Sequence, residues 1–450
     1  MTRSIVSRRK ALTGLGALLA YPALTRGAWA DQFIDPFEFG LSGESQDDQS
    51  AAMQAAIDAA SLRAKDVLLP PGEYYVRDLE LRGSMRLFGV PGGTHLVGWG
   101  GGPIGRLGSV SDLVLDGMSF SAGEGRPDGE NRGLLEFEDS TAVTIRNCMF
   151  TGAPICGLSV LRAGATIENC DFIGLGDAAI HSADSRGLMI RGNRISECGN
   201  AGVRIWRGES GPDGSIITGN RIAQIDWQGG GNGQTGNGVN VFQADDVIVA
   251  DNVISGCAFS AIRVNAGNNT QIRGNTCLDS GEVAIFSEFG FSGSVIADNI
   301  VDGAATGISI TNLDSGGHLA TCTGNIVRNI TAASAVNPDT RPVGIYAEAD
   351  TVVANNTIEG VPGIGIVAGY GPYVRNVIVS DNVIIGVETG IGVSVVQEQS
   401  PGPVRVSGNI IGKGAAHAIV GMEWENIVST DLAADAGRYP NVTVSGNTAG

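Results

Sequence analysis

The sequence predicts an all-β solenoid in which each turn of the coil contains three short strands. The first observation is an asparagine that recurs along the chain, with most gaps between 23 and 32 residues. The second is a set of apolar columns at fixed positions around that asparagine. A period of roughly 20–50 residues is the sequence signature of repeat architectures. The recurring residues are Asn193, Asn220, Asn252, Asn275, Asn299, Asn325, Asn356, Asn382, Asn409 and Asn447.

The apolar columns define the three strands of each turn. A β-branched residue stands three positions before most of these asparagines, as at Val249, and another stands two positions after, as at Ile254. A third strand of the form Gly/Ala-Ile/Val-x-Ile/Val follows, as in residues 238–241. Three such strands cannot bury a face alone, but stacked turns enclose a continuous apolar interior. Asparagine suits a turn that needs a left-handed backbone angle, and its amide can bond to the turns above and below.

The columns resemble those of right-handed parallel β-helix proteins, the pectate-lyase-like group. The asparagine column resembles the asparagine ladder of that fold, at the turn between its second and third sheets. The resemblance covers residues from about 110 to the end, and it implies a single-stranded right-handed parallel β-helix. The chain is most similar to an uncharacterised family of twin-arginine-exported bacterial repeat proteins within this group.

The N-terminal part of the mature chain is predicted to contain a capping helix. Residues 47–50 form a helix cap, and Met53, Ala56, Ile57 and Ala60 form its apolar stripe. An unpaired sheet edge at the end of a solenoid needs a cover, so we expect the helix to lie over the first coil. Residues 31–110 are therefore assigned to the cap and first coils, and residues 111–450 to the repeats of the same continuous domain.

Residues 1–30 are predicted to be an export signal. Ser7, Arg8, Arg9 and Lys10 precede an apolar run that is too short to span a membrane, and a cleavage site follows at residues 28–30. The paired arginines resemble the twin-arginine signal. The alternative is an ordinary secretory signal whose basic region contains two arginines. Either signal predicts a periplasmic or extracellular protein without stable membrane insertion, and the first also predicts the twin-arginine machinery as a partner.

The charge of the chain argues against two classes of partner. The formal net charge is −18, and removing residues 1–30, which contain five basic and no acidic residues, changes it to −23. Such an acidic protein is poorly suited to nucleic acid or to an anionic membrane. An acidic polysaccharide would need local arginines or a bridging cation.

The seven cysteines are predicted to be buried thiols. They fall in the repeat columns, where other turns have small apolar residues or the ladder asparagine, so each is expected to pack as a small hydrophobe. A bridge between Cys148 and Cys170, in adjacent turns, is the alternative. The cysteines are Cys148, Cys156, Cys170, Cys198, Cys257, Cys277 and Cys322.

The resemblance implies that any activity lies on the outer face of the sheet made by the third strands. Period-two alternation gives its outward residues. Aromatic, amide and charged groups together suit a polysaccharide, although outward positions on any solenoid are polar by default. The outward positions in the later coils, Val367, Gly392, Ser394 and Val420, are bland. The predicted substrate-binding residues are His181, Arg204, Trp206, Asn240, Phe242, Asn265, Tyr346 and Glu348.

Two reaction types are considered for this face. Hydrolysis needs two carboxylates, for which Glu288 and Asp245 are the candidates. Elimination needs a base beside an anion-neutralising group, and Arg263 next to Glu288 could serve. The polygalacturonase motifs Asn-Thr-Asp, Gly-Asp-Asp, Gly-His-Gly and Arg-Ile-Lys do not occur, so no catalytic residue is carried over from that family.

The sequence therefore predicts an exported protein that acts on or binds a cell-envelope or extracellular polysaccharide. A hydrolase or lyase is the first hypothesis, and a non-catalytic glycan-binding or envelope structural protein is the alternative. We expect no cofactor and no dedicated metal site; calcium on acids such as Asp245, Asp246 and Glu288 is the weaker alternative. Residues 421–450 leave the C-terminal end of the solenoid open either to a fold-back cover or to a second subunit.

Overall fold

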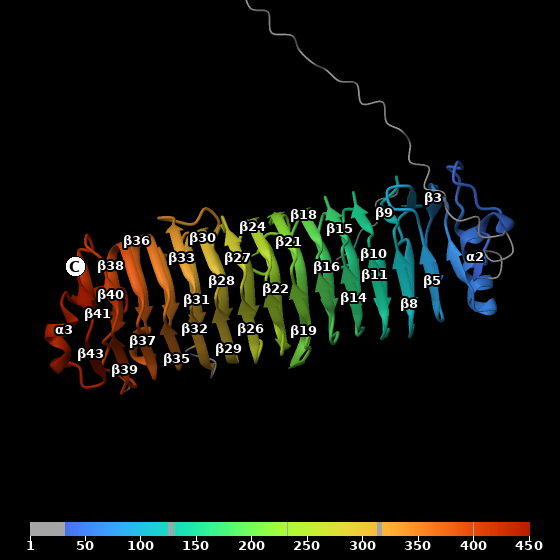
Figure 1. Ribbon diagram of the computed structural model, residues 1–450. Coiled ribbons are helices and arrows are strands. Elements are labelled where there is room, and N and C mark those ends of the chain that lie inside the picture. The colour runs from blue at the N-terminus through green and yellow to red at the C-terminus, as the bar shows by residue number, and fades with distance from the viewer. Residues whose placement is uncertain (1–31, 125–128, 130, 232, 313–316, 399) are drawn as a thin grey trace, which may run out of the picture.

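The computed structural model describes residues 32–124, 129, 131–231, 233–312, 317–398 and 400–450, so the predicted export signal at residues 1–30 lies outside the described residues. The chain forms an elongated coil of about 13 turns in which strands of successive turns stack side by side (Figure 1). The pairs within the stacks are parallel, and one hairpin at the C-terminal end is antiparallel. The all-β parallel solenoid predicted from the repeats is confirmed.

Each complete turn contributes one strand to each of three faces. The first face is a 16-stranded sheet. Its strands are β1 (Phe33–Ile34), β2 (Asp66–Leu68), β5 (Met85–Phe88), β8 (Leu113–Asp116), β11 (Val143–Arg146), β14 (Ala165–Glu168), β17 (Met189–Arg191), β20 (Ile216–Thr218), β23 (Ile248–Ala250), β26 (Thr270–Arg273), β29 (Ser292–Ala297), β32 (His318–Thr323), β35 (Thr351–Ala354), β37 (Val377–Ser380), β39 (Val404–Ser407) and β43 (Val442–Ser445).

The second face follows the asparagine turn, and it is joined to the third face through the long strands β36 and β38. Its strands are β3 (Gly72–Val76), β6 (Thr94–Gly98), β9 (Ser119–Ser121), β12 (Met149–Thr151), β15 (Asp171–Ile173), β18 (Arg194–Cys198), β21 (Arg221–Ile225), β24 (Val253–Cys257), β27 (Thr276–Leu278), β30 (Ile300–Ala304), β33 (Ile326–Ile330), β40 (Ile410–Ile411), β44 (Thr448–Ala449) and the first halves of β36 (Thr357–Ala368) and β38 (Val383–Ser394).

The third face consists of the Gly/Ala-Ile/Val-x-Ile/Val strands and carries the site described below. Its strands are β4 (Leu79–Leu81), β7 (Gly105–Gly108), β10 (Gly133–Glu138), β13 (Cys156–Leu161), β16 (Ala178–Ala183), β19 (Ala201–Pro212), β22 (Asn237–Asp245), β25 (Ile262–Asn265), β28 (Val283–Glu288), β31 (Thr306–Thr311), β34 (Val343–Ala347), β41 (His417–Glu423) and the second halves of β36 and β38.

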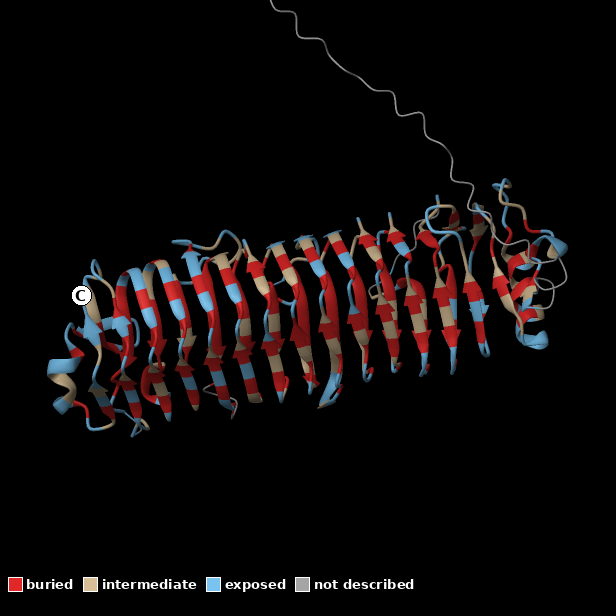
Figure 2. Cartoon of the chain, viewed as in Figure 1, coloured by how far each residue is buried: buried red, intermediate tan, exposed pale blue. Residues whose placement is uncertain are grey.

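The core runs through the centre of the coil as stacks of inward side chains. Buried and more exposed residues alternate along the strands, which Figure 2 shows as red segments interrupted by tan and pale blue. The early turns stack three aromatic rings in parallel, Phe120 on Phe150 at 4.9 Å and Phe150 on Phe172 at 4.8 Å between ring centroids. Identical positions in successive turns therefore pack against one another, as the column pattern predicts.

The asparagine ladder is formed as expected. The amide Nδ2 of Asn220 donates to Oδ1 of Asn252 at 2.9 Å and to the carbonyl oxygen of Ile190 at 3.0 Å. The same pattern continues from Asn193 to Asn447, and the ladder amides are buried in all but the last turn. Each rung thus links three turns of the coil.

The left-handed angle at this turn belongs to a different residue from the one expected. The ladder asparagines are absent from the residues with positive φ, and the residue immediately before each has it, as at Asp251 (φ 58°), Gly274 (φ 65°) and Asn355 (φ 59°). Glycine, aspartate and asparagine tolerate that angle best, which explains their recurrence at this position. The ladder residue is selected by its amide hydrogen bonds instead.

Both ends of the coil are covered. At the N-terminal end, α2 (Ser50–Arg63) buries the predicted stripe of Met53, Ala56, Ile57 and Ala60. The N-cap residue of this helix is Gln49, whose side chain makes no capping bond. Of the two acids in the predicted cap, Asp48 contacts the helix start by accepting a hydrogen bond from the backbone amide of Ser50 at 2.9 Å, whereas Asp47 bonds to Ser45. The short helices of the fold are η1 (Pro36–Phe39), η2 (Gly371–Tyr373), α3 (Leu432–Asp435) and η3 (Ala436–Arg438).

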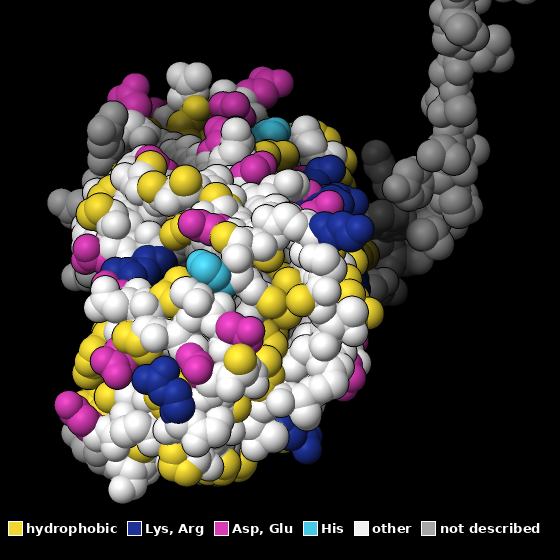
Figure 3. Space-filling model, turned by 90° about the vertical axis from the view of Figure 1, so that its left-hand side faces the viewer, with side chains coloured by type: hydrophobic (Ala, Val, Ile, Leu, Met, Phe, Trp, Pro, Cys, Tyr) yellow, Lys and Arg dark blue, Asp and Glu magenta, His cyan; other side chains and the backbone are white. Residues whose placement is uncertain are grey.

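The fold-back alternative is the one observed at the C-terminal end. Strand β42 (Asn426–Ser429) pairs antiparallel with β41, and the segment that follows buries Leu432 and Tyr439. The end of the molecule that faces the viewer in Figure 3 carries several separate hydrophobic patches among polar atoms. A second subunit on this end stays a prediction.

All seven cysteines are buried free thiols, so the disulfide between Cys148 and Cys170 is not formed. Burial raises the pKa of Cys198, Cys257 and Cys322 to about 12. A thiol with so high a pKa carries little of the reactive thiolate at neutral pH. The cysteines therefore pack as small apolar residues, as their columns predict.

Candidate functional site

The outward residues of the third face stack as the period-two pattern predicts. One row pairs His181 with Arg204, Arg204 with Asn240, Asn240 with Arg263, and Arg263 with Phe286 in successive turns. The next outward row brings Trp206, Phe242, Asn265 and Glu288 into register in the same way. The expectation that Arg204 and Arg263 flank Asn240 is confirmed.

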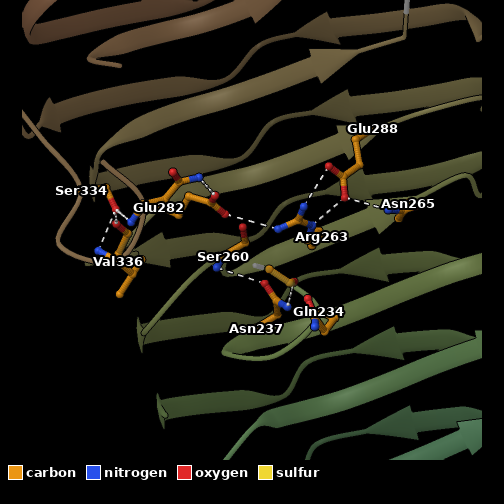
Figure 4. Close-up of polar contacts among 12 residues, drawn as sticks. Gln234, Asn237, Ser260, Arg263, Asn265, Glu282, Glu288, Ser334 and Val336 are labelled. Carbon is orange, nitrogen blue, oxygen red and sulfur yellow. Dashed lines mark hydrogen bonds and ion pairs between the residues drawn. The ribbon is translucent and has the colours of Figure 1, made fainter. Parts of the chain in front are cut away.

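Arg263 is the centre of a buried polar network (Figure 4). Its Nε donates to Oε1 of Glu288 at 2.6 Å and its Nη2 donates to Oε2 at 2.9 Å. Asn265 Nδ2 adds a third bond to Oε1 of Glu288 at 2.9 Å, and the guanidinium packs over the ring of Phe286. Because Glu288 is only 2% exposed and accepts from both neighbours, its carboxylate is occupied in binding Arg263.

A second carboxylate on the same guanidinium has a different environment. Glu282 lies 3.4 Å from Arg263 Nη1 through Oε2, and its Oε1 accepts a hydrogen bond from Asn337 Nδ2 at 2.7 Å. Burial raises the pKa of Glu282, and the bond from Asn337 and the charge of Arg263 only partly offset that effect. A buried carboxyl with a raised pKa on a concave surface is a candidate proton donor.

Glu282 is not among the predicted site residues, because those were outward positions within the third strands and this strand begins at Val283. The glutamate stands one residue earlier, in the turn that enters β28. The available signal was a carboxylate directly before the strand of Glu288, beside the two outward rows that contain Arg263 and Glu288. The contact with Asn337 could not be inferred, because 55 residues separate the two in the chain.

The N-terminal part of the outward row is covered by a loop. The loop between β21 and β22 folds back so that Asn240 Nδ2 donates to the carbonyl oxygen of Gln234 at 3.2 Å. A Cβ built on Gly233 would lie 1.7 Å from Arg263 Nη1, so the loop backbone rests directly on the guanidinium. Asn240 is 4% exposed as a result. This part of the face is packed against protein.

Arg204 and His181 belong to a buried cluster under the same covered region. Arg204 pairs with Asp177 at 2.8 Å and lies over the ring of Trp206. Burial, followed by the positive charge of Arg204, lowers the pKa of His181 to about 4. Burial opposes ionisation of Asp177 as well, but Arg204 and hydrogen bonds from Asn200 and Cys156 hold its pKa below the usual value. His181 is therefore neutral at physiological pH.

Asp245 lies in a network separate from that of Glu288. Its Oδ1 accepts hydrogen bonds from the backbone amide and the side-chain Nδ2 of Asn268, both at 2.9 Å. Asn268 then accepts a bond from the backbone amide of Ser292 in the following turn. The carboxylate stabilises a turn between neighbouring coils, and the pairing of Asp245 with Glu288 as hydrolytic residues remains a prediction.

An open groove lies over the later coils of the third face, with about 320 Å³ of free space. One wall is the loop that follows β33, and the other is formed by residues 369–370 and by the β41–β42 hairpin. Among its lining residues are Glu282, Phe286, Thr306, Ser309, Thr311, Asn337, Asp339, Arg341, Tyr346, Glu348, Val367, Tyr370, Ser394, Met422, Trp424 and Glu425. We call this feature the groove.

The lining of the groove combines aromatic rings with carboxylates. Trp424, which is 44% exposed, packs edge-on against Tyr370 at 5.1 Å between ring centroids. Arg341 and Glu425 form an ion pair across the two walls. Burial and the negative charge of Glu348 raise the pKa of Tyr346, so this hydroxyl stays protonated.

The groove includes only part of the predicted binding set. Tyr346 and Glu348 line it, whereas the six earlier binding candidates and the three catalytic candidates are not among its lining residues. Of the bland outward positions in the later coils, Val367 and Ser394 line the groove, whereas Gly392 and Val420 are not among its lining residues. Segments that are distant in the chain form the walls of the groove, and Val367 and Ser394 lie on its floor.

The described residues lack a membrane-spanning helix and a cluster of metal-binding side chains. None of the helices in this part of the chain is long and apolar enough to cross a membrane. Among the same residues, no group of three or more His, Cys, Asp or Glu side chains is placed to hold a metal ion.

The family comparison agrees with the geometry. A family model described as the right handed beta helix region matches residues 132–226 and 157–332. The match covers 201 of the 450 residues, and the chain has the parallel β-helix fold. No curated protein matches this β-helix protein by sequence.

Solved structures similar to this β-helix protein come from several biological settings. Tailspike protein 3 of bacteriophage CBA120 is 11% identical with a TM-score of 0.54, covering 96% of this chain and 65% of the tailspike. The surface protein and adhesin PfbA of Streptococcus pneumoniae is 15% identical with a TM-score of 0.46, covering 86% and 99%. An exopolygalacturonase of Thermotoga maritima is 13% identical with a TM-score of 0.43, covering 85% and 92%. At these identities the likeness concerns the fold.

Proposed function

We propose that this protein is an exported carbohydrate-active β-helix protein whose substrate lies in the groove. The observation that carries the proposal is the combination of exposed aromatic rings and carboxylates in one open depression of the third face. Aromatic faces stack on the apolar faces of sugar rings, while carboxylates and hydroxyls bind sugar hydroxyl groups. Export is proposed from the signal pattern of residues 1–30.

Glu282 is the proposed proton donor to a glycosidic oxygen. It lines the groove, and burial raises its pKa, which is the property that keeps a carboxyl protonated for such a transfer. Arg263 and Asn337 position it from opposite sides. Glu288 is assigned to holding Arg263 rather than to the reaction, since both of its oxygens accept hydrogen bonds within the protein.

Binding is tested first, with a pair of matched tryptophan variants. Trp424→Ala removes an aromatic ring from the groove, and Trp99→Ala removes one of similar exposure (38%) that also packs on a tyrosine, Tyr75, in the N-terminal turns. On a glycan array with mature protein from Asp31, we expect Trp424→Ala to lose binding about tenfold or more and Trp99→Ala to bind as the parent does. Equal binding by both variants would place the site elsewhere.

Turnover is tested on any glycan that binds. Glu282→Gln should lower product formation by at least about a hundredfold while retaining binding, as expected for removal of a general acid. Glu138→Gln, on the same face but in an early turn, is the control and should be fully active. Binding without turnover in the parent protein would support the non-catalytic glycan-binding alternative.

A further inference from the structure

We infer that the groove selects a glycan carrying protonated amino groups, of the deacetylated hexosamine class, over neutral and carboxylated glycans. The inference rests on the proposed function and names the substrate class of that same site. It follows from the charges that line the groove, from the place of its aromatic rings, and from the internal pairing of the arginines on this face.

The charges lining the groove are predominantly negative. Four acidic residues and one basic residue, Arg341, contribute to its lining, and one of the four acids is Glu282, the proposed protonated proton donor. Arg341 is paired with Glu425, and Glu282 is the acid next to Arg263. Asp339, which is exposed on the loop wall, and Glu348, which is 7% exposed on the floor, add further negative charge. An anionic ligand would meet repulsion from both the wall and the floor.

The pKa of Tyr346 depends on burial and on the charges at the floor of the groove. Burial is the largest cause of its raised pKa, and the negative charge of Glu348 is the next. Glu425 acts in the same direction, while Arg341 partly opposes it. Burial disfavours a phenolate and a cation alike, whereas the negative charges of Glu348 and Glu425 disfavour a phenolate and favour a cation, because a charge acts on the two with opposite sign.

Aromatic rings next to these acids supply the second element of ammonium recognition. A cation over the face of a tryptophan or tyrosine is attracted by the ring quadrupole. Trp424 is 44% exposed and packs against Tyr370. Tyr346 lies on the floor of the groove, between Ser309 and Val367 of the neighbouring turns. An amino sugar presents both groups that such a surface binds, an apolar ring face and an ammonium.

The arginines that a uronate polymer would need are occupied elsewhere. Arg204 is 3% exposed and paired with Asp177. Arg263 makes two hydrogen bonds to Glu288 and lies under the loop at Gly233. With Arg341 held by Glu425, each of these three arginines already has a carboxylate partner. Within the described part of the chain, these three arginines therefore offer no ready partner for a carboxylated sugar.

The test compares three tetrasaccharides by calorimetry with full-length mature protein: glucosamine tetramer, its N-acetylated counterpart, and tetragalacturonate. The first two share one sugar backbone and differ at the nitrogen, which is a protonated amine in one and a neutral acetamide in the other. At a pH where the amine is protonated and at low salt, we expect the glucosamine tetramer to bind about tenfold more tightly than the acetylated one, and tetragalacturonate to bind least. Added salt should reduce that preference.

A matched pair of variants assigns the preference to the groove. Glu348→Gln should reduce the ratio between the first two ligands toward one, and Glu359→Gln, on an exposed position of β36 outside the groove, should leave it unchanged. If Glu348→Gln does not fold, the salt dependence of the parent protein still tests whether the preference is electrostatic.

The outcomes separate the two proposals. Equal or tighter binding of the acetylated or galacturonate tetramer overturns the charge selection while the glycan-binding groove stands. Failure of all three, together with no array binding by the parent protein, overturns the proposed function itself. A glucosamine preference that is insensitive to salt and persists in a folded Glu348→Gln protein also overturns the inference.

Discussion

Arg263 and Glu288 lie in adjacent turns of the coil and form a two-point ion pair, with Nε–Oε1 at 2.6 Å and Nη2–Oε2 at 2.9 Å. The side chains are 12% and 3% exposed, respectively. Removal of one partner of such a buried pair leaves an uncompensated charge, which is more costly than the pair is stabilising. We therefore expect the pair to hold neighbouring turns together, and its role in a reaction stays a prediction.

Glu288→Gln is expected to lower the free energy of unfolding by about 3 kcal/mol or more for this reason. Thermal and urea unfolding measure the loss. Glu138→Gln is the control, because Glu138 is 57% exposed in its pair with Arg162 and such surface pairs contribute about 1 kcal/mol or less. Unchanged stability of Glu288→Gln together with lost turnover would instead return Glu288 to the catalytic role.

Asn299→Ala should interrupt the asparagine ladder. The Asn299 amide accepts from the backbone and side chain of Asn275 and donates to Ile272 and Asn325, all in buried surroundings. Unsatisfied buried donors cost about 1–3 kcal/mol each, so we expect a loss of about 3 kcal/mol in urea unfolding. Hydrogen exchange should be fastest in the turns on either side of residue 299.

The control for the ladder is Asn426→Ala, on an exposed strand position of β42. It should change the unfolding free energy by less than about 0.5 kcal/mol. Similar losses in the two variants would mean that the ladder amides contribute no more than a surface asparagine.

Gly233→Ala tests how closely the loop backbone rests on Arg263. The added Cβ would meet the guanidinium at 1.7 Å, and φ at this residue is 106°. Gly230→Ala is the matched variant, since its φ is also positive but nothing lies within 4 Å of the new Cβ. Backbone strain alone should cost about 1–2 kcal/mol in each. Gly233→Ala should cost clearly more in thermal unfolding, and equal losses would contradict the contact.

His181 should make stability depend on pH. The pKa of His181 is lowered to about 4 from an ordinary value of 6.5, so between these values the unfolded chain binds the extra proton. Stability is therefore retained above pH 6.5 and falls as the pH is lowered toward 4, with a slope of up to about 1.4 kcal/mol per pH unit. Urea unfolding across this range measures the slope.

His181→Gln should remove that contribution to the slope. The same substitution at the half-buried His417 is the control and should keep the dependence seen in the parent protein. An identical slope in the parent and in His181→Gln would show that His181 is not the group responsible.

The repeats allowed most of the fold to be predicted. The inward columns, the ladder asparagines and the stripe of Met53, Ala56, Ile57 and Ala60 all occupy the predicted places. These features arise from contacts between residues at a constant spacing, so each turn repeats the evidence of the last. The left-handed residue was assigned one position too late, because the pattern alone does not show which of two adjacent polar residues has the unusual angle.

The site was predicted less well, because it depends on contacts that follow no repeat. Alternation placed Arg263 beside Glu288, but it could not show that the β21–β22 loop covers Asn240 or that Asn337 reaches Glu282. Loop conformation and the pairing of distant segments decide which outward residues face open space. Alternation alone consequently could not show that Val367 lies on the floor of a groove.

The sequence by itself determined the coil: its three strands per turn, its buried thiols, its ladder and the identity of its outward rows. These depend on period and side-chain volume, which are local properties repeated along the chain. Only the tertiary structure decided which part of the outer face is open. That choice depends on where three non-repeating segments fold back, and their contacts with Arg263, Glu282 and Tyr370 join residues that are far apart in the chain.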